Sequence, residues 1–414
     1  MSDLFWPGDE RAGSLMTQEA LLEAMVAVEG RWLTALVSAG VAPPSAQADL
    51  TGLVTGADVE AVASGAEGGG NPVIPLLRLL RQRILPASEN ASRWLHRGLT
   101  SQDVVDTALM LCARDVLDRV ADELTAQVFV LSDLADAHRD SLMVGRTLTQ
   151  HAVPITFGLK AGGWLDGVLD AAGAVSSARS GLGVQVGGAA GTLSAATQLA
   201  RDAGLADPVG AVEGLVATLA SGLGLGVRTA WHTSRGPVTR IGDALVSCTD
   251  AWGRVTADVA TLARPEIGEL GEPVTAGRGG SSTMPQKQNP VLSVLVRRAA
   301  IAAPGLGSTL HTAAAVAVDE RPDGAWHAEW ATLRTLSRYT VVAASHTTEL
   351  LSGLRVDTVR MEARVRAEAG SVLAERSSVS GPDADPDPAT YLGTTGPSID
   401  AARTRAAAYL EGRP

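Results

Sequence analysis

A glycine- and serine-rich stretch in the second half of the chain, Gly277 to Pro290 (GRGGSSTMPQKQNP), combines residue types that bind anions and move protons. Its consecutive glycines let backbone N–H groups converge on an anion. Hydroxyl groups and a cation follow within a few positions: Ser281, Ser282, Thr283 and Lys287. The stretch lacks the GxxxxGK[ST] spacing and the preceding strand of a nucleotide-binding P-loop. It is a candidate site for a charged small molecule, and a solvated surface loop is the alternative that composition alone supports.

Lys287 is unusual because arginine supplies nearly all the other positive charge. Of the 34 lysine and arginine residues, only Lys160 and Lys287 are lysines. Lys287 and Asn289 alternate with two glutamines, so both side chains are expected on one side of a locally extended turn. A cation and an amide aimed at one point suit the stabilisation of charge that develops during a reaction.

A second polar cluster, His96 to Ala108 (HRGLTSQDVVDTA), stands where a long helix is expected to begin. Thr100 and Ser101 precede the helix, and Asp103 falls in its first turn. A helix N-terminus with hydroxyl groups attracts a carboxylate through its unpaired N–H groups. The Thr100-x-x-Asp103 spacing is also a capping box, with Asp in place of Glu, which needs no ligand. Residue types alone leave both interpretations open.

A third polar cluster, Gly145 to Gly158 (GRTLTQHAVPITFG), precedes another expected helix. It contains Thr149, Gln150 and His151. A histidine beside a glutamine is more often a hydrogen-bonded structural residue than a catalyst, so His151 is only a candidate acid or base, as is His96.

No metal site is expected from the remaining histidines. WHTSR (231–235) and GAWHAEW (324–330) each place a histidine beside a tryptophan, which suits packing against a helix cap or an interface. His327 and Glu329 have no third ligand at helical spacing.

Composition and charge narrow the classes of partner. The chain has 414 residues, 45% hydrophobic but only 3% aromatic, which suits helices packed through small side chains. The formal net charge of −11 argues against nucleic acid and anionic membrane surfaces. Cys112 and Cys248 are too few for a disulfide framework or a zinc cluster and are expected to be buried thiols. No secretory signal or uninterrupted apolar span is visible, so a soluble cytoplasmic protein is expected.

Apolar residues recur at spacings of three or four over most of the chain, which predicts an all-α fold. The 46 residues from Leu99 to Val144 contain neither glycine nor proline, and a continuous helix there would be about 70 Å long. Such a rod predicts a long bundle shared between subunits. Further helical tracts are expected at 156–177, 193–203, 238–264, 291–303 and 326–354.

Two stretches interrupt the helical pattern. Residues 265–290 carry five glycines and form a long loop, a kind of loop that is usually functional or disordered. The stretch SSVSGPDADPDPATYLGTTGPS (377–398), after Arg376, is expected to form a linker or a loosely ordered tail. We therefore expect an N-terminal helical domain (1–108), a central long-helix domain that carries the loop (109–355) and a short C-terminal region (356–414) that is a truncated helical domain.

Together these segments resemble the fumarase/aspartase superfamily. GSSTMPQKQNP (280–290) resembles its long and specific signature GSSxMPxKxNP, and HRGLTSQDVVDTALML (96–111) resembles its first motif. VGGAAGTL (186–193) is similar to the segment between the motifs. Within the superfamily, residues 145–165, WHTSRGPVTR and GAWHAEWATL are similar to the bacterial 3-carboxy-cis,cis-muconate cycloisomerases. The resemblance covers roughly residues 1–365.

The resemblance implies an all-α, three-domain homotetramer whose active sites combine residues of three subunits, without cofactor or metal. It implies a small polycarboxylate substrate and chemistry through an aci-carboxylate carbanion. The cycloisomerase branch would convert 3-carboxy-cis,cis-muconate to 4-carboxymuconolactone in the β-ketoadipate pathway of aromatic-compound breakdown. The alternative is β-elimination on a succinyl-type substrate with release of fumarate.

The same resemblance implies roles for individual residues. Ser281 matches the loop serine that moves the α-proton, and Lys287 and Asn289 match residues that stabilise the intermediate and hold a carboxylate. The substrate-binding candidates are Thr100, Ser101, Gln102, Thr149, Gln150, Arg235, Ser282 and Met284.

The chain departs from the superfamily pattern at two places. Leu148 stands where many superfamily lyases have a histidine that protonates the leaving group. A cycloisomerase whose leaving group is a carboxylate needs no such donor, so Leu148 favours that branch. The resemblance also implies that the C-terminal domain is shortened after about Arg376, and this domain helps to shape the site entrance in the superfamily.

Overall fold

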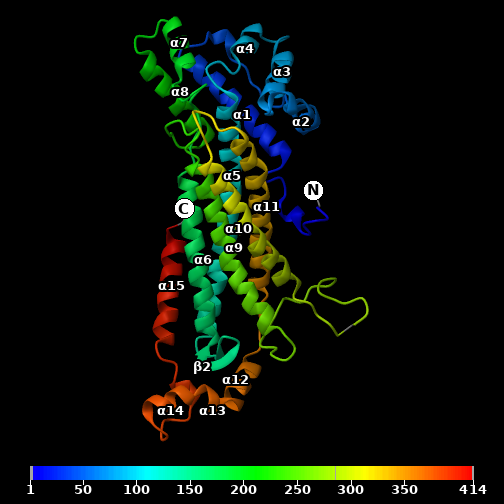
Figure 1. Cartoon of the computed structure of the whole chain (residues 1–414), viewed down its shortest axis with the longest axis vertical. Helices are drawn as coiled ribbons and strands as arrows, with labels where there is room; N and C mark the ends of the chain where they lie inside the picture. Colours follow the sequence, from blue (N-terminus) through cyan, green and yellow to red (C-terminus); the bar gives the residue numbers. More distant parts are fainter. Residues whose placement is uncertain (1–2, 285, 413–414) are drawn as a thin grey trace.

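The computed structural model describes residues 3–284 and 286–412, which form a long, narrow helical molecule (Figure 1). Its central bundle consists of α5 (Ser101–Ala137), α6 (Phe157–Ser180), α9 (Gly236–Leu262), α10 (Val291–Ala315) and α11 (Gly324–Ser352). These helices run side by side along the long axis of the molecule. The all-α prediction is confirmed.

Small and branched aliphatic side chains fill the bundle. Along α5, Val105, Leu109, Val116 and Val120 are buried at helical spacing. Every residue from Gln102 to Ala113 is buried, so the first part of α5 runs through the interior. The helix crosses the boundary predicted at residue 108.

Both cysteines are buried free thiols, as the sequence predicted. Burial raises the pKa of the Cys112 thiol to about 12.

Shorter helices cover the end of the bundle at which α5 begins (Figure 1). They are α1 (Gln18–Ser38), α2 (Val59–Ala66), α3 (Val73–Ile84), α4 (Glu89–Trp94), α7 (Ser194–Asp202) and α8 (Pro208–Leu223), with 3-10 turns at Asp9–Ala12, Pro44–Ala46, Gly56–Asp58 and Glu67–Gly69. Trp32 of α1 is completely buried and donates its indole N–H to the carbonyl oxygen of Arg97 over 2.7 Å. This contact fixes the segment that leads into α5.

The helix expected from Leu99 to Val144 is shorter than its lack of glycine and proline suggested. α5 ends at Ala137, and β1 (Leu142–Thr147) then pairs antiparallel with β2 (Gln150–Thr156) in a hairpin. Leu148 and Thr149 form the turn with φ values of 48° and 70°, the left-handed values of a tight hairpin. A second two-stranded pair joins β3 (Leu270–Gly271) and β4 (Arg355–Val356).

The C-terminal region is mostly helical. α12 (Thr358–Ala367), α13 (Ala369–Val372) and α14 (Ala374–Ser380) lie at the hairpin end of the bundle. After a 3-10 turn at Pro388–Thr390, α15 (Thr395–Glu411) runs back along α6 and α5. Ile399, Ala402 and Ala406 are buried at helical spacing. These side chains bury an apolar face of α15 on the bundle, and most of this helix lies beyond the stretch 377–398 that was expected to be a linker.

α10 has two different faces. One face packs between α9 and α11 and buries residues such as Leu292, Val296 and Ala299 at helical spacing. The other face leaves Val294 and Ile301 exposed by 57% and 77%. By length and composition alone, α10 would also suit a membrane span, but its buried face follows the pattern of a bundle helix.

Candidate active site

The glycine-rich loop, residues 272–290, joins β3 to α10 and projects from the side of the bundle (Figure 1). Its two ends are held together by Glu272, whose carboxylate accepts the backbone N–H groups of Leu292 (3.0 Å) and Ser293 (2.7 Å). These N–H groups lie in the first turn of α10, where they have no partner within the helix. Glu272 thus caps α10 and closes the base of the loop.

The two limbs of the loop meet in a narrow neck, residues 278–280 and 288–290. The carbonyl oxygen of Gly279 accepts both the backbone N–H of Asn289 (2.8 Å) and its side-chain Nδ2 (3.0 Å). Gly279 has φ of 74°, and a Cβ at this position would lie 2.7 Å from the carbonyl oxygen of Asn289. Only glycine fits this approach. Asn289, a predicted catalytic residue, therefore uses its amide to brace the neck in this structure.

Ser281 begins the loop tip, residues 281–287, beyond the neck. Its Oγ accepts the backbone N–H of Met284 at 3.2 Å and that of Thr283 at 3.4 Å. Two N–H dipoles directed at one oxygen stabilise negative charge on it. The loop tip thus supplies the polarised hydroxyl that a serine acid or base requires.

All the predicted site residues of the loop lie in its tip and neck. They are Ser281, Ser282, Met284, Lys287 and Asn289. The backbone N–H of Lys287 donates to the carbonyl oxygen of Met284 (3.0 Å), which turns the chain back toward the neck. Ser282, Met284 and Lys287 are exposed, whereas Ser281 and Asn289 are half-buried.

The second cluster lies at the N-terminus of α5. Thr100 is the N-cap residue, and its backbone N–H donates to Asp103 Oδ2 over 3.0 Å, as the capping box predicts. The Thr100 hydroxyl accepts a hydrogen bond from Arg321 Nη2 (2.5 Å), which also donates to the carbonyl oxygen of Ala189 (3.3 Å). Arg321 is exposed, so its cation stands at the surface beside Thr100 and Ser101. A cation at a helix N-terminus suits a carboxylate ligand.

Asp103 is buried beneath this helix end and holds three segments together. Its carboxylate accepts hydrogen bonds from five groups: the N–H groups of Thr100 (3.0 Å), Gly187 (2.9 Å) and Gly188 (2.9 Å), and the Nε2 atoms of Gln185 (3.1 Å) and His232 (3.2 Å). Several charge-assisted hydrogen bonds compensate the burial of this group. Asp103 therefore fixes the surroundings of Thr100 without facing solvent.

Gln102 and Arg235, two predicted substrate-binding residues, point into the interior instead. Gln102 is buried, and its Nε2 donates to Asp106 Oδ2 (3.1 Å) and to the carbonyl oxygen of His232 (2.9 Å). The Arg235 side chain is 0% exposed and pairs with Asp106 (2.7 Å) and Glu329 (2.5 Å). In this structure both side chains are therefore engaged by interior hydrogen bonds and ion pairs.

The ion network around Arg235 joins α5, the start of α9 and α11. Burial alone would lower the pKa of Arg235, but Asp106 and Glu329 raise it above its usual value. Burial also raises the pKa of Glu329, although Arg235 opposes this shift. The indole N–H of Trp326 donates to Asp106 Oδ1 over 2.9 Å. Removing one member would leave a buried charge unpaired, a change that typically costs about 3–5 kcal/mol.

The third cluster lies at the tip of the β1–β2 hairpin. Thr149 and Gln150 are exposed, and Gln150 Nε2 donates to Thr149 Oγ1 (3.3 Å). His151 Nδ1 lies 3.6 Å from Glu368 Oε2, a loose contact. Leu148 is 96% exposed in a left-handed conformation that costs a branched side chain energy. The tight turn between β1 and β2 requires this conformation.

His96, the other candidate histidine, also has a left-handed backbone, with φ of 68°. Its Nδ1 lies 2.6 Å from Oε1 of Glu29, a completely buried carboxylate on α1. A short hydrogen bond of this kind fixes the orientation of the ring. The His96 side chain is 16% exposed, so its ring is held in place at the edge of the interior.

The three clusters do not meet within one chain. Thr100 precedes the first residue of α5 and the hairpin follows its last, so the 37 residues of this helix separate them by about 55 Å. Figure 1 shows the glycine-rich loop projecting from the bundle well away from the helix end where α5 begins. No rearrangement of one chain short of unfolding α5 would bring Thr100 to Gln150.

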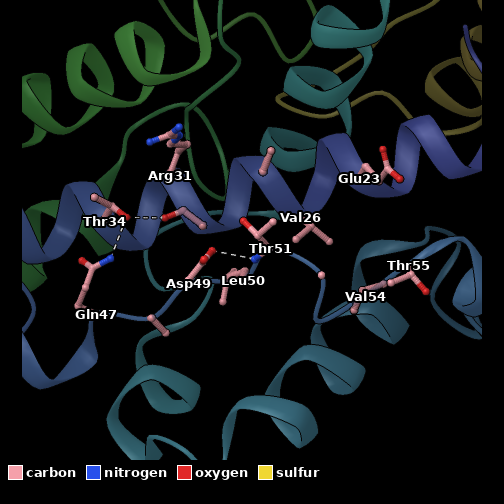
Figure 2. Close-up of a pocket in the computed structure, with 14 residues that line it drawn as sticks. Glu23, Val26, Arg31, Thr34, Gln47, Asp49, Leu50, Thr51, Val54 and Thr55 are labelled. Atoms are coloured by element: carbon pink, nitrogen blue, oxygen red, sulfur yellow. Dashed lines mark hydrogen bonds between the residues drawn. The ribbon is translucent and has the colours of Figure 1, made fainter.

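A hollow of about 550 Å³ lies elsewhere, between α1 and residues 47–55 (Figure 2). Glu23, Arg31, Asp49 and Thr55 contribute polar groups to its wall, which includes none of the predicted site residues. Within residues 3–284 and 286–412, no group of three or more His, Cys, Asp or Glu side chains is arranged to hold a metal ion. The motif clusters therefore remain the candidate site.

Comparison with known proteins identifies the family. The sequence model of the lyase family matches residues 70–305 of this chain. The chain is 40% identical to the nitrosuccinate lyase of Streptomyces davaonensis over 364 residues, which cover 87% of this chain and 76% of that protein. It is 37% identical to the 3-carboxy-cis,cis-muconate cycloisomerase of Bradyrhizobium diazoefficiens over 360 residues, covering 86% and 76%.

The chain belongs to the fumarase/aspartase superfamily. Its fold matches the crystal structure of the 3-carboxy-cis,cis-muconate lactonizing enzyme from Pseudomonas putida, with a TM-score of 0.86, 31% identity and 96% coverage of both chains. It also matches fumarate lyase from Mesorhizobium sp. BNC1, with a TM-score of 0.80, 25% identity and 97% coverage of both chains. The chain is thus an enzyme of the lyase and isomerase type found in this superfamily, as its motifs predicted.

Sequence reasoning missed Arg321. This residue lies in AVDERPDGAWHAEW, just before α11, and approaches Thr100 only through the fold. Because arginine supplies 32 of the 34 lysine and arginine residues, one more arginine in a loop gave no signal. The adjacent acidic residues and proline, which are typical of a surface loop, were the only hint of an exposed position.

Proposed function

We propose that this enzyme is a cycloisomerase that converts 3-carboxy-cis,cis-muconate to 4-carboxymuconolactone, as a cytoplasmic step of aromatic-compound breakdown in the β-ketoadipate pathway. The observation that carries the proposal is the Ser281 hydroxyl, which accepts two backbone N–H groups on a loop with the superfamily signature. The 37% identity to a cycloisomerase and the TM-score of 0.86 to a lactonizing enzyme support this substrate.

In the proposed reaction, the nucleophile belongs to the substrate. One carboxylate oxygen adds to a double-bonded carbon of the diene, and the π electrons move toward the neighbouring carboxyl group to give an aci-carboxylate. This C–O bond closes the γ-lactone ring, and Ser281 Oγ then transfers its proton to the adjacent carbon, which discharges the aci-carboxylate. The substrate trianion takes up one proton overall, and Ser281 regains its proton from solvent. The enzyme lowers the barrier by holding the diene folded and by stabilising the developing charge.

Each cluster has a separate task in this reaction. The N–H groups of Thr283 and Met284 stabilise the Ser281 oxygen after it gives up its proton. The compact ammonium of Lys287 neutralises the aci-carboxylate. The planar guanidinium of an arginine would approach it with a different geometry. At the start of α5, a substrate carboxylate is bound by the hydroxyl groups of Thr100 and Ser101 and by the cation of Arg321.

The active enzyme in this proposal is a homotetramer in which three subunits contribute to each site. The separation of about 55 Å between Thr100 and the hairpin supports this arrangement, because one chain cannot assemble the clusters. The exposed apolar side chains of α10, Val294 and Ile301, support it as well, since another subunit would bury them.

A direct assay tests the proposal. Purified full-length protein is mixed with 3-carboxy-cis,cis-muconate, and the ultraviolet absorbance of the diene is followed with time. We expect the absorbance to fall as the lactone forms, and to stay constant with Ser281→Ala protein at the same concentration. A constant absorbance with wild-type protein of confirmed tetrameric mass would reject this substrate.

A β-elimination is the second candidate, favoured by the 40% identity to nitrosuccinate lyase. Ser281 would then act as a base and take the proton from the carbon next to a carboxylate, while the bond to the leaving group breaks and fumarate forms. Nitrite leaves as a stable anion and needs no protonation, so Leu148 is compatible with this reaction too. Release of nitrite and fumarate from nitrosuccinate, without consumption of carboxymuconate, would select this function over the first.

A further inference from the structure

Glu349 on α11 contacts two arginines that come from distant parts of the chain. Its Oε1 accepts a hydrogen bond from Arg278 Nη1 (2.5 Å), and its Oε2 accepts one from Arg11 Nη2 (2.7 Å). Arg278 lies in the neck of the glycine-rich loop, three residues before Ser281. Arg11 lies in the N-terminal strap, residues 3–16, which runs along α11. One carboxylate therefore joins the strap to the foot of the loop.

The strap is fastened to the bundle along its length. Trp6 stacks on Tyr339 of α11 with ring centroids 3.2 Å apart, and the guanidinium of Arg298 on α10 lies 3.6 Å from the centroid of the Trp6 ring. Arg338 of α11 pairs with Asp9 at 2.6 Å. The strap is thus a fixed support from which Arg11 reaches Glu349.

The three side chains lie between the interior and the solvent. Arg278 is 22% exposed, Glu349 32% and Arg11 28%. Burial opposes ionisation of Glu349, but the hydrogen bonds from Arg278 and Arg11 outweigh it and lower the pKa of this carboxyl. Arg11 Nη1 also donates to Ser345 Oγ (3.0 Å), which fixes the direction of its guanidinium. Partial desolvation makes such contacts stronger than those of freely exposed ion pairs.

We propose that Glu349 is a positioning residue for the glycine-rich loop. Through Arg278 it fixes the neck from which Ser281 and Lys287 project, and through Arg11 it ties the neck to the strap. Glu349 itself does not touch the substrate. The inference rests on the proposed function only in assigning the proton transfer to Ser281, and it holds for either substrate.

The consequence of losing Glu349 follows from the remaining contacts of the loop. The Gly279–Asn289 hydrogen bonds keep the neck closed, and Glu272 keeps the loop base closed. The neck would nevertheless be free to swing relative to α11, so that Ser281 reaches the substrate carbon in only part of the molecules. Because Thr100 and Arg321 still bind the substrate, kcat should fall about three- to tenfold while KM changes little.

Hydrogen exchange of the intact enzyme at short times tests this inference, together with kcat and KM. The variant is Glu349→Gln, and Glu362→Gln is the matched control because Glu362 pairs with Arg366 at 2.5 Å on the surface, where the two side chains are 49% and 68% exposed. In Glu349→Gln we expect faster exchange in residues 3–16 and 272–290, together with the loss in kcat. The control should match wild type in both readouts.

Variants of the two arginines test separately the two contacts of Glu349, which together form the anchor of the loop. They also keep the proposal testable if Glu349→Gln fails to fold. Arg278→Gln should speed exchange in the loop alone, and Arg11→Gln in the strap alone. Arg278→Lys should restore part of the protection and of kcat, since a lysine keeps one hydrogen bond to Oε1. Unchanged loop exchange in both Glu349→Gln and Arg278→Gln overturns the proposal. Faster loop exchange in an enzyme that is inactive on both substrates supports the anchor and rejects the proposed function.

Discussion

The Nη2 atom of Arg321 donates a hydrogen bond of 2.5 Å to the hydroxyl oxygen of Thr100, the residue that caps the longest helix of the bundle. This contact places a guanidinium beside the positive end of the α5 dipole. Two sources of positive potential thus coincide at the surface of a chain whose net charge is −11. A local region of positive potential on an acidic protein attracts a polyanionic substrate.

If Arg321 binds the proposed tricarboxylate substrate, Arg321→Gln should raise KM for it by about tenfold or more, because one charge-assisted hydrogen bond is lost. The effect on kcat should be smaller, since the Arg321 guanidinium binds the substrate equally in the ground state and in the transition state. Steady-state kinetics check this, with Arg366→Gln as a surface control. An unchanged KM would show that Arg321 serves only to cap Thr100 and Ala189.

Asp103→Asn should destabilise the fold by about 2–4 kcal/mol. In the wild-type protein both oxygens of Asp103 accept hydrogen bonds. Asparagine replaces one of these oxygens with an NH₂ group, so at least one buried N–H loses its acceptor. Urea unfolding of the variant and of Asp115→Asn measures the effect, because Asp115 is a 52% exposed carboxylate on the same helix. Equal stabilities of the two variants would contradict the role given to Asp103.

His346 should make the stability of the enzyme fall as the pH falls. Burial, reinforced by Arg11, Arg298 and Arg278 and opposed by Glu349, lowers its pKa from 6.5 to about 4. Between these values the unfolded chain binds a proton that the folded chain does not, so stability rises with pH across this window. The contribution present above pH 6.5 is lost by pH 4 and amounts to roughly 3 kcal/mol.

Unfolding free energies at pH 7 and pH 4.5, for wild type and His346→Gln, check this sign and size. The variant should lose less stability on acidification, because glutamine does not titrate. The same loss in both proteins would assign the acid sensitivity to other groups.

Lys287→Arg should lower kcat by at least about tenfold even though the charge is kept. The guanidinium is planar and larger than an ammonium, so it cannot approach the proposed aci-carboxylate in the same way. The matched control is Lys160→Arg, which changes the only other lysine and lies 3.6 Å from Asp258, away from the loop. Near-normal turnover of Lys287→Arg would exclude the role proposed for Lys287.

The helices could be predicted because their pattern is local. The tract expected at 238–264 is α9 (Gly236–Leu262), and the tract expected at 326–354 is α11 (Gly324–Ser352). The hairpin could not be predicted in the same way. Residues 142–144 contain nothing that forbids a helix, and only pairing with β2 makes them a strand.

The candidate site likewise has a part that could be predicted from local sequence and a part that depends on the fold. The loop residues from Ser281 to Asn289 are neighbours in sequence, so their grouping was visible there. The burial of Arg235 was not, because Asp106 and Glu329 reach it from two other helices. An arginine beside a motif is expected to bind a ligand until the fold shows which carboxylates already hold it.

The central claim is that the Ser281 hydroxyl moves the proton while two backbone N–H groups hold its charge. The most direct test is kcat of Ser281→Ala, measured with the substrate that wild-type protein converts. Ser281 lies on a projecting loop, so the unfolding free energy should stay within about 0.5 kcal/mol of wild type. We predict a kcat at least about a hundredfold lower, with KM nearly unchanged. A folded variant that retains more than about a tenth of wild-type kcat would contradict the claim.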